Sequence, residues 1–130
     1  MSDLKRLPER PDAIAPDGSD VRVLLGVRGG GLAHFELAAG ETSTAVRHRT
    51  VEEVWFFLGG RGQMWRRDAD GRERTDDVAA GVSIDIPLGT TFQFRALGDE
   101  ALSAIGATMP PWPGEGEAIV CDGPWRPTVP

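Results

Sequence analysis

The sequence has little cysteine, which limits the chemistry open to it. Its single cysteine, Cys121, cannot form a disulfide within the chain. A chain without paired cysteines is typical of a reducing compartment, so we expect a cytoplasmic protein. Cys121 has no histidine near it in the sequence and no predicted helix N-terminus to activate its thiol, which argues against a nucleophilic role.

Long hydrophobic runs are also missing. The longest unbroken apolar run, Val54–Leu58, is far too short to span a membrane. The first residues, MSDLKRLPERPDAIAPDG, lack the apolar core of a signal peptide. We therefore expect a soluble protein with no membrane partner.

An excess of positive charge is missing as well. The chain has 14 Lys+Arg against 20 Asp+Glu, a formal net charge of -6, which opposes binding to a phosphate backbone. The stretch Arg61–Arg74 is rich in arginine, but Asp68, Asp70 and Glu73 lie among the arginines. We interpret this stretch as a solvated hairpin and expect no nucleic-acid partner.

No long 3.6-residue periodicity indicates a helix. Instead, 17 glycines and 10 prolines separate short apolar segments, which favours an all-β barrel or sandwich. The Asp68–Gly71 segment has the composition of a hairpin turn, and the prolines of Met109–Gly114 predict a rigid loop. We expect strands at 21–27, 32–37, 43–49, 53–58, 62–67, 72–78, 83–86, 91–96, 102–108 and 118–121.

The length of 130 residues fits one domain with one core. We divide the chain into an extended N-terminal arm (1–20), a barrel (21–121) and a C-terminal tail (122–130). The arm is polar and rich in proline, so we expect it to be ordered only where it docks on the barrel or on another subunit.

Two segments carry the functional information. In the first, Gly40, His48, Glu53 and Gly60 have the spacing of a motif in which a His-x-His pair follows the first glycine, but Val46 stands at the first histidine position. In the second, Gly81, Pro87 and Gly89 match a motif that continues to a histidine, and Phe92 stands at that position.

These segments resemble the two motifs of the cupin superfamily, and the resemblance covers about residues 21–109. It implies a small antiparallel β-barrel of the jelly-roll type. In the family, three histidines and a glutamate hold a transition metal inside the barrel. Of these, only His48 and Glu53 remain here, so we predict no metal site and no cofactor. The other histidine, His34, remains a possible additional ligand.

Strand alternation predicts which side chains face a cavity in the barrel. Glu53 shares a face with Trp55 and Phe57, and His48 shares one with Val46; either Met64 or Trp65 enters from the next strand. Such a set is typical of a small-molecule site, although the same aromatics could simply fill the barrel. The predicted ligand-binding residues are Val46, His48, Glu53, Trp55, Phe57, Gln63, Trp65, Phe92 and Phe94.

His48 and Glu53 have two possible roles. They can form an acid/base couple, in which the carboxylate orients the imidazole, or they can be a polar pair that satisfies itself beside a binding pocket. The first role predicts a small-metabolite enzyme, namely an isomerase, a lyase or a metal-dependent dioxygenase. The second predicts a protein that binds a small, partly apolar organic molecule, and we favour it.

Three further features stay open at this point. Val54 and Phe56 make the second face of their strand apolar too, so that face should be covered by another layer or by a second subunit, and we expect a homodimer. Trp112 and Trp125 could close the mouth of the barrel or pin the tail, and we expect pinning. Asp85 should face solvent.

Overall fold

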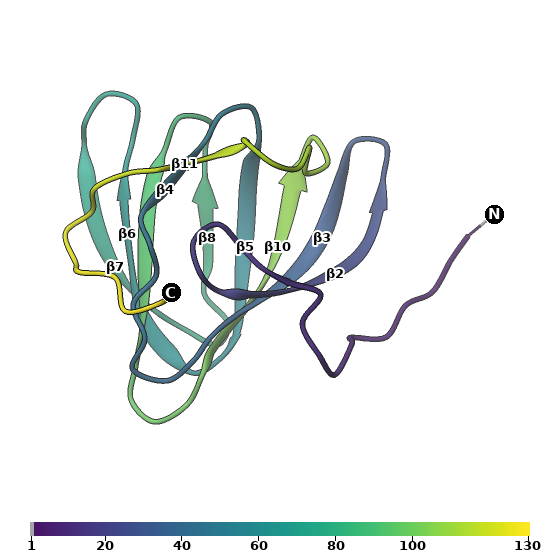
Figure 1. The fold of residues 1–130 in the computed structure, drawn as a ribbon, viewed down its shortest axis with the longest axis horizontal. Helices are drawn as coiled ribbons and strands as arrows, with labels where there is room; N and C mark the ends of the chain where they lie inside the picture. The colour runs from purple at the N-terminus through teal and green to yellow at the C-terminus, as the bar shows by residue number, and fades with distance from the viewer. Residues whose placement is uncertain (1) are drawn as a thin grey trace.

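The computed structural model describes residues 2–130, which form two antiparallel β-sheets facing each other (Figure 1). Sheet A has the strand order β1 (Ala13–Ile14), β2 (Asp20–Val27), β3 (Gly30–Leu37), β10 (Leu102–Met109), β5 (Glu52–Gly59) and β8 (Ser83–Ile86). Sheet B has the order β11 (Ala118–Val120), β4 (Val46–His48), β9 (Thr91–Leu97), β6 (Arg61–Arg67) and β7 (Glu73–Ala79). The predicted all-β, jelly-roll fold is confirmed. No helix among these residues is long and apolar enough to cross a membrane.

Each strand expected from the sequence is present, with two differences in detail. β4 begins later than expected, because its register with β9 shifts by one residue between the isolated bridge Thr42–Arg95 and the pair Val46–Phe92. The N–H of Thr44 in this gap donates to Asp17 instead, at 2.8 Å. β1 lies within the N-terminal arm and pairs with β2, with Ala13 opposite Val21. This short strand has no alternating pattern of its own by which it could be predicted.

The glycines of the two motifs act at turns. Gly40, Gly60, Gly81 and Gly89 all have positive φ, between 72° and 92°. At Gly60 a Cβ atom would also lie only 2.2 Å from the backbone oxygen of Ala101. Side chains are strained in this conformation, so the motif spacing reports where the chain must turn.

The core lies between the sheets, because every second side chain points inward. Along β5, Trp55 and Phe57 are buried, each with 1% exposure, whereas Val54, Phe56 and Leu58 point outward with 44–47% exposure. The core cluster consists of Phe35, Leu37, Val46, Trp55, Phe57, Met64, Val78, Ile84, Ile86, Phe92, Phe94, Ala96, Leu102 and Ala104.

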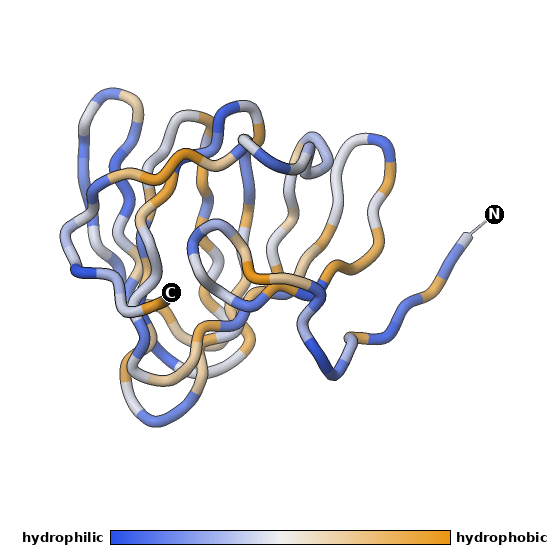
Figure 2. The backbone as a smooth tube through the Cα atoms, in the orientation of Figure 1, coloured by the Kyte–Doolittle hydropathy of each residue, from blue (hydrophilic) through white to orange (hydrophobic). Residues whose placement is uncertain are grey.

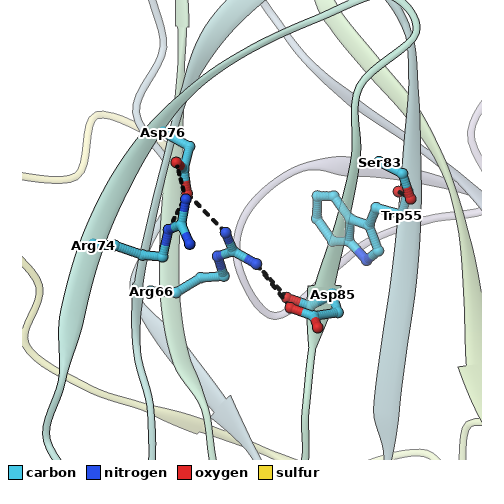
Figure 3. Close-up of polar contacts among 6 residues, drawn as sticks. All are labelled: Trp55, Arg66, Arg74, Asp76, Ser83 and Asp85. Atoms are coloured by element: carbon cyan, nitrogen blue, oxygen red, sulfur yellow. Dashed lines mark hydrogen bonds and ion pairs between the residues drawn. The ribbon is translucent and has the colours of Figure 1, made fainter.

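An ion-pair network joins the two sheets at one side (Figure 3). The Arg66 guanidinium on β6 lies 2.7 Å from a carboxylate oxygen of Asp76 on β7 and 2.9 Å from one of Asp85 on β8. Asp76 also binds Arg74 at 2.6 Å. The Asp85 side chain is largely exposed, as the sequence suggested, and it is held at the edge of sheet A.

The C-terminal tail covers part of the outer face of sheet B. The buried Gln93 side chain donates to the backbone oxygens of Ser43 and Trp125, both at 2.8 Å. The Arg95 guanidinium lies 4.2 Å from the centre of the Trp125 ring. Trp125 therefore pins the tail, as expected.

Candidate functional site

A cavity of about 490 Å³ opens between the arm and the inner face of the barrel. Its volume lies within the range of small-molecule sites. Most of its wall is apolar, and Figure 2 shows that the chain around β1, which contributes to this wall, is hydrophobic. The lining residues are Ala13, Ile14, Ala15, Pro16, Asp17, Val21, Val23, Leu24, Gly26, Gly31, Leu32, Ala33, Phe35, Val46, His48, Glu53, Trp55, Thr108, Pro111 and Trp112.

Glu53 is the central polar residue of the cavity. It lies near the start of β5 with 4% exposure, opposite Thr108 on β10. The Thr108 hydroxyl donates a hydrogen bond to Oε2, and the Trp55 indole N–H donates to Oε1 at 3.2 Å. Burial raises the pKa of Glu53 to about 7, although these two hydrogen bonds favour the charged form. Glu53 can therefore gain or lose a proton near neutral pH.

His48 lies beside Glu53 in the wall of the cavity. Its Nδ1 atom lies 3.8 Å from Glu53 Oε1 and has no hydrogen-bond partner within residues 2–130. Phe92 and Trp112 contact the imidazole edge to face, with ring centroids 5.4 and 5.1 Å away. Burial lowers the pKa of His48, although the charge of Glu117 acts in the opposite direction. The imidazole is therefore neutral near pH 7, and its buried Nδ1 atom has no partner among residues 2–130.

Glu117 fixes the backbone beyond His48. Its carboxylate accepts hydrogen bonds from the N–H groups of Arg49 and Thr50, at 2.6 and 2.7 Å, and from the Thr50 hydroxyl. The strand that Glu117 precedes, β11, pairs Ala118 with His48. These contacts hold the end of β4 and thereby the direction of the imidazole.

Asp17 brings a second buried carboxylate to the cavity. Its Oδ1 accepts hydrogen bonds from the N–H and hydroxyl of Ser19, at 2.9 and 2.6 Å, and its backbone oxygen accepts from Thr44. Burial raises the pKa of Asp17, and its charge contributes to the raised pKa of Glu53. Asp17 lies in an irregular segment, so no sequence pattern identifies it.

The positions at which the cupin motifs carry metal ligands do not fit a metal here. Val46 and Phe92 face each other in the β4–β9 register, and both are fully buried. His34 points to the opposite face of β3 from Phe35, away from His48 and Glu53. No group of three or more His, Cys, Asp or Glu side chains in the described residues is placed to hold a metal ion. Of the four motif positions, only His48 and Glu53 carry side chains that can donate to a metal.

The predicted aromatic residues divide between cavity and core. Trp55 lines the cavity and stacks on Phe35, with ring centroids 4.8 Å apart. Phe57, Phe92 and Phe94 surround the other sides of Trp55 at 5.2–6.1 Å and do not line the cavity. They support the wall through their contacts with Trp55 rather than form its surface. Their predicted place on the surface of the pocket is therefore corrected to a place behind it.

Phe35 also lines the cavity, although it is not among the residues predicted from the sequence; the alternation along β3 places it inside. Its stack on Trp55 depends on Gly106, the residue opposite Trp55 on β10. A Cβ atom there would lie 2.6 Å from Phe35 Cε2 and 3.0 Å from Trp55 Cδ1. Gly106 therefore makes room for the aromatic floor of the cavity.

Gln63 and Trp65 lie on the outer face of sheet B, which corrects their predicted place in the pocket. Met64 takes the inward position on β6 and is fully buried, so both of its neighbours point outward. Gln63 accepts from Arg95 at 2.6 Å, and the Trp65 indole N–H donates to Glu73 at 2.9 Å.

Trp112 closes one side of the cavity mouth, contrary to the expectation that it pins the tail. It follows the proline pair after β10, lines the cavity and contacts the His48 ring. Thr108 and Trp112 thus join the site from the end of β10. The inward parity of residues 102–108 identifies Thr108 as the polar inward residue of that strand.

Comparison with known proteins supports the fold alone. No protein-family model matches the sequence, and no curated protein matches it. Among solved structures, the capsular polysaccharide assembling protein CapF from Staphylococcus aureus has a TM-score of 0.71 and 18% identity, over 84% of this chain and 33% of its own. Oxalate decarboxylase from Bacillus subtilis has a TM-score of 0.68 and 18% identity, over 86% and 30%.

The coconut allergen cocosin has a TM-score of 0.68 and 18% identity, over 79% of this chain and 29% of its own. The chain therefore spans about a third of the length of the solved chains that it matches. CapF, oxalate decarboxylase and cocosin all contain cupin domains. The chain has the cupin fold, as its two motifs predict.

Proposed function

We propose that the chain binds a small, largely apolar organic molecule in the cavity between the arm and the barrel. The observation that carries this proposal is the cavity itself: about 490 Å³ of space with an apolar wall and a few buried polar groups on one side. Such a combination is typical of a site where apolar contact gives affinity and polar groups fix orientation. A filled barrel would leave no such space.

The free nitrogen of His48 supports this proposal. A buried polar atom without a protein partner loses its contact with water, which is unfavourable unless another group bonds to it. His48 Nδ1 is such an atom, and His48 lines the cavity. A ligand that donates a hydrogen bond to it would remove this penalty.

Fluorescence of N-phenyl-1-naphthylamine, a neutral aromatic probe that becomes bright in apolar surroundings, tests the proposal. We expect saturable binding to the wild-type protein. Ala33→Leu adds volume to the cavity wall and should weaken binding about tenfold or more through steric overlap. Ala39→Leu is the matched control, because Ala39 is exposed and lies outside the lining. Binding that is equal in all three proteins would overturn the proposal.

A second candidate function is proton transfer on a bound metabolite, as in an isomerase or a lyase. The observation that favours it is the carboxyl of Glu53, whose pKa of about 7 suits a general acid or base, 3.8 Å from the imidazole of His48. Glu53→Gln would then abolish turnover of an identified substrate while retaining binding. Full turnover by that variant would exclude the acid/base role.

A metal-dependent reaction receives no such support. Oxalate decarboxylase from Bacillus subtilis has Mn(II) centres. In the present chain two of the four motif positions, Val46 and Phe92, carry side chains that cannot donate to a metal. These positions therefore do not favour a metal-dependent dioxygenase.

We also propose that the chain forms a homodimer through the outer face of sheet A. Val54, Phe56 and Leu58 project from β5 with nearly half of each side chain exposed, and Leu32 on β3 adds to the same face. Adjacent exposed apolar side chains on a sheet favour association. A second copy that presents the same face would cover them with self-complementary contacts.

A further inference from the structure

The charge of the cavity restricts the class of ligand, and this restriction rests on the proposed binding function. Two acidic side chains, Asp17 and Glu53, line the cavity, and both are at least 95% buried. No lysine or arginine is among the lining residues in the described part of the chain. His48 is the only basic side chain there, and burial favours its neutral form.

We infer that the cavity is selective for an apolar molecule that carries a basic amine, and that it discriminates against organic acids. The two carboxyl groups have no cationic partner among the lining residues of the described chain. An ammonium group would be such a partner, and it has several N–H donors. A carboxylate ligand would instead place a third acidic group in a cavity without a cation.

The arrangement of hydrogen bonds supports this direction. The Thr108 hydroxyl and the Trp55 indole N–H donate to Glu53. Because an ionised carboxylate has about four acceptor sites, Glu53 can still accept further hydrogen bonds. His48 Nδ1 accepts no bond from residues 2–130 and lies 3.8 Å from Glu53 Oε1. With the His48 proton on Nε2, one ammonium group beside this pair would donate an N–H to each of the two atoms.

The apolar part of the molecule has its own surface in the same cavity. Phe35 and Trp55 form a stacked floor, and Trp112 stands at the mouth beside the imidazole of His48. A planar ring suits such walls, because aromatic groups pack favourably on one another. The net charge of -6 adds a long-range attraction for a cationic ligand.

Three naphthalene derivatives of almost equal size test the inference: 2-naphthylmethylamine, 2-naphthalenemethanol and 2-naphthoate. Their dissociation constants are measured by displacement of N-phenyl-1-naphthylamine at pH 8. We expect the amine to bind about tenfold more tightly than the alcohol, and the acid more weakly than either. An acid that binds as tightly as the amine, or an alcohol equal to the amine, would overturn the inference.

Variants separate charge from shape. Glu53→Gln removes a negative charge at pH 8, above the Glu53 pKa of about 7, with little change of volume, so it should weaken the amine and leave the alcohol nearly unchanged. Asp17→Asn should have the same effect, because a bound ammonium group favours the ionised form of Asp17 against the burial that raises its pKa. Glu115→Gln, an exposed carboxylate outside the cavity, is the control. Equal loss for amine and alcohol would indicate a structural role and contradict the inference. Failure of the neutral N-phenyl-1-naphthylamine to bind would instead overturn the proposed function itself.

Discussion

Thr108 lies directly opposite Glu53 in the β5–β10 register, and its hydroxyl donates a hydrogen bond to the Glu53 carboxyl. The two residues come from strands far apart in the sequence, and both are buried, with 6% exposure for Thr108 and 4% for Glu53. This pairing keeps an ionisable group inside an apolar barrel. Its consequences appear first in the pH dependence of stability.

We expect Glu53 to reduce stability as the pH rises. Its pKa is raised from 4.5 to about 7 in the folded protein, so the folded state binds the proton more tightly than the unfolded state. The resulting stabilisation is complete below pH 4.5 and is lost as the pH rises to about 7. Between pH 5 and pH 8 this group alone should lower the free energy of unfolding by about 2 kcal/mol.

Urea unfolding of the wild type and Glu53→Gln at both pH values isolates this contribution, because other titrating groups are common to the two proteins. The decrease in the free energy of unfolding between pH 5 and pH 8 should be about 2 kcal/mol smaller in the variant. An identical pH dependence in both proteins would show that Glu53 has an ordinary pKa.

We expect that histidines at positions 46 and 92 would create a metal site. Val46→His with Phe92→His would place two imidazoles beside His48 and Glu53, which completes a donor set suited to manganese, iron or zinc. We expect about one metal ion per chain in the double variant by elemental analysis after loading and desalting. The wild type should retain well below one under the same treatment.

The control is Val46→Ala with Phe92→Ala, which changes the same positions without adding donors. Circular dichroism of each variant establishes that the β-sheet fold persists. Stoichiometric metal in the wild type would contradict our description of the site.

Phe56→Lys tests the proposed dimer. Phe56 is 47% exposed within one chain, so the substitution should leave the fold intact while placing charges at the centre of the apolar face. We expect sedimentation to show a dimer for the wild type and a monomer for this variant. Thr75→Lys, on exposed β7 of sheet B, should remain dimeric. A monomeric wild type would refute the prediction.

Glu117→Gln should lower the stability of the fold and also weaken ligand binding in the cavity. Burial alone would raise the pKa of Glu117, but the hydrogen bonds from Thr50 and the adjacent backbone outweigh it and lower the pKa. The stabilisation by the carboxylate is therefore present above the ordinary value of 4.5 and is lost as the pH falls below it. We expect a loss of about 1–2 kcal/mol at pH 7.

The exposed Glu115, two residues earlier, provides the comparison. Glu115→Gln should change the free energy of unfolding by less than about 0.5 kcal/mol. Because Glu117 anchors the backbone after His48, only its variant should also weaken N-phenyl-1-naphthylamine binding. Equal effects of the two substitutions would contradict the anchoring role.

The sequence predicts the fold well because turns and alternation are local properties. Positive φ at Gly40 and Gly60 fixes where strands end, and the two-residue period assigns Trp55 inward and Phe56 outward. These features depend on the residues within one strand or turn. They can therefore be predicted without knowledge of the neighbouring strands.

The site is only partly predictable because it depends on contacts between distant segments. Asp17 reaches the cavity through an irregular part of the arm, where no periodicity exists. Trp65 and Met64 alternate along one strand, and either register is compatible with the sequence until the partner strands are placed. The size of the cavity depends on Gly106, whose role becomes visible only when Phe35 and Trp55 stack beside it.

Trp125 and the tail cover part of sheet B, and this cover limits how copies of the chain can stack. A two-layer β protein with both outer faces open could stack face to face without limit. In this chain the tail occupies part of one face through its contacts with Gln93 and Arg95, and polar side chains such as Gln63 cover more of it. The proposed pairing through the other face would then end at two copies, so the tail would also oppose polymerisation.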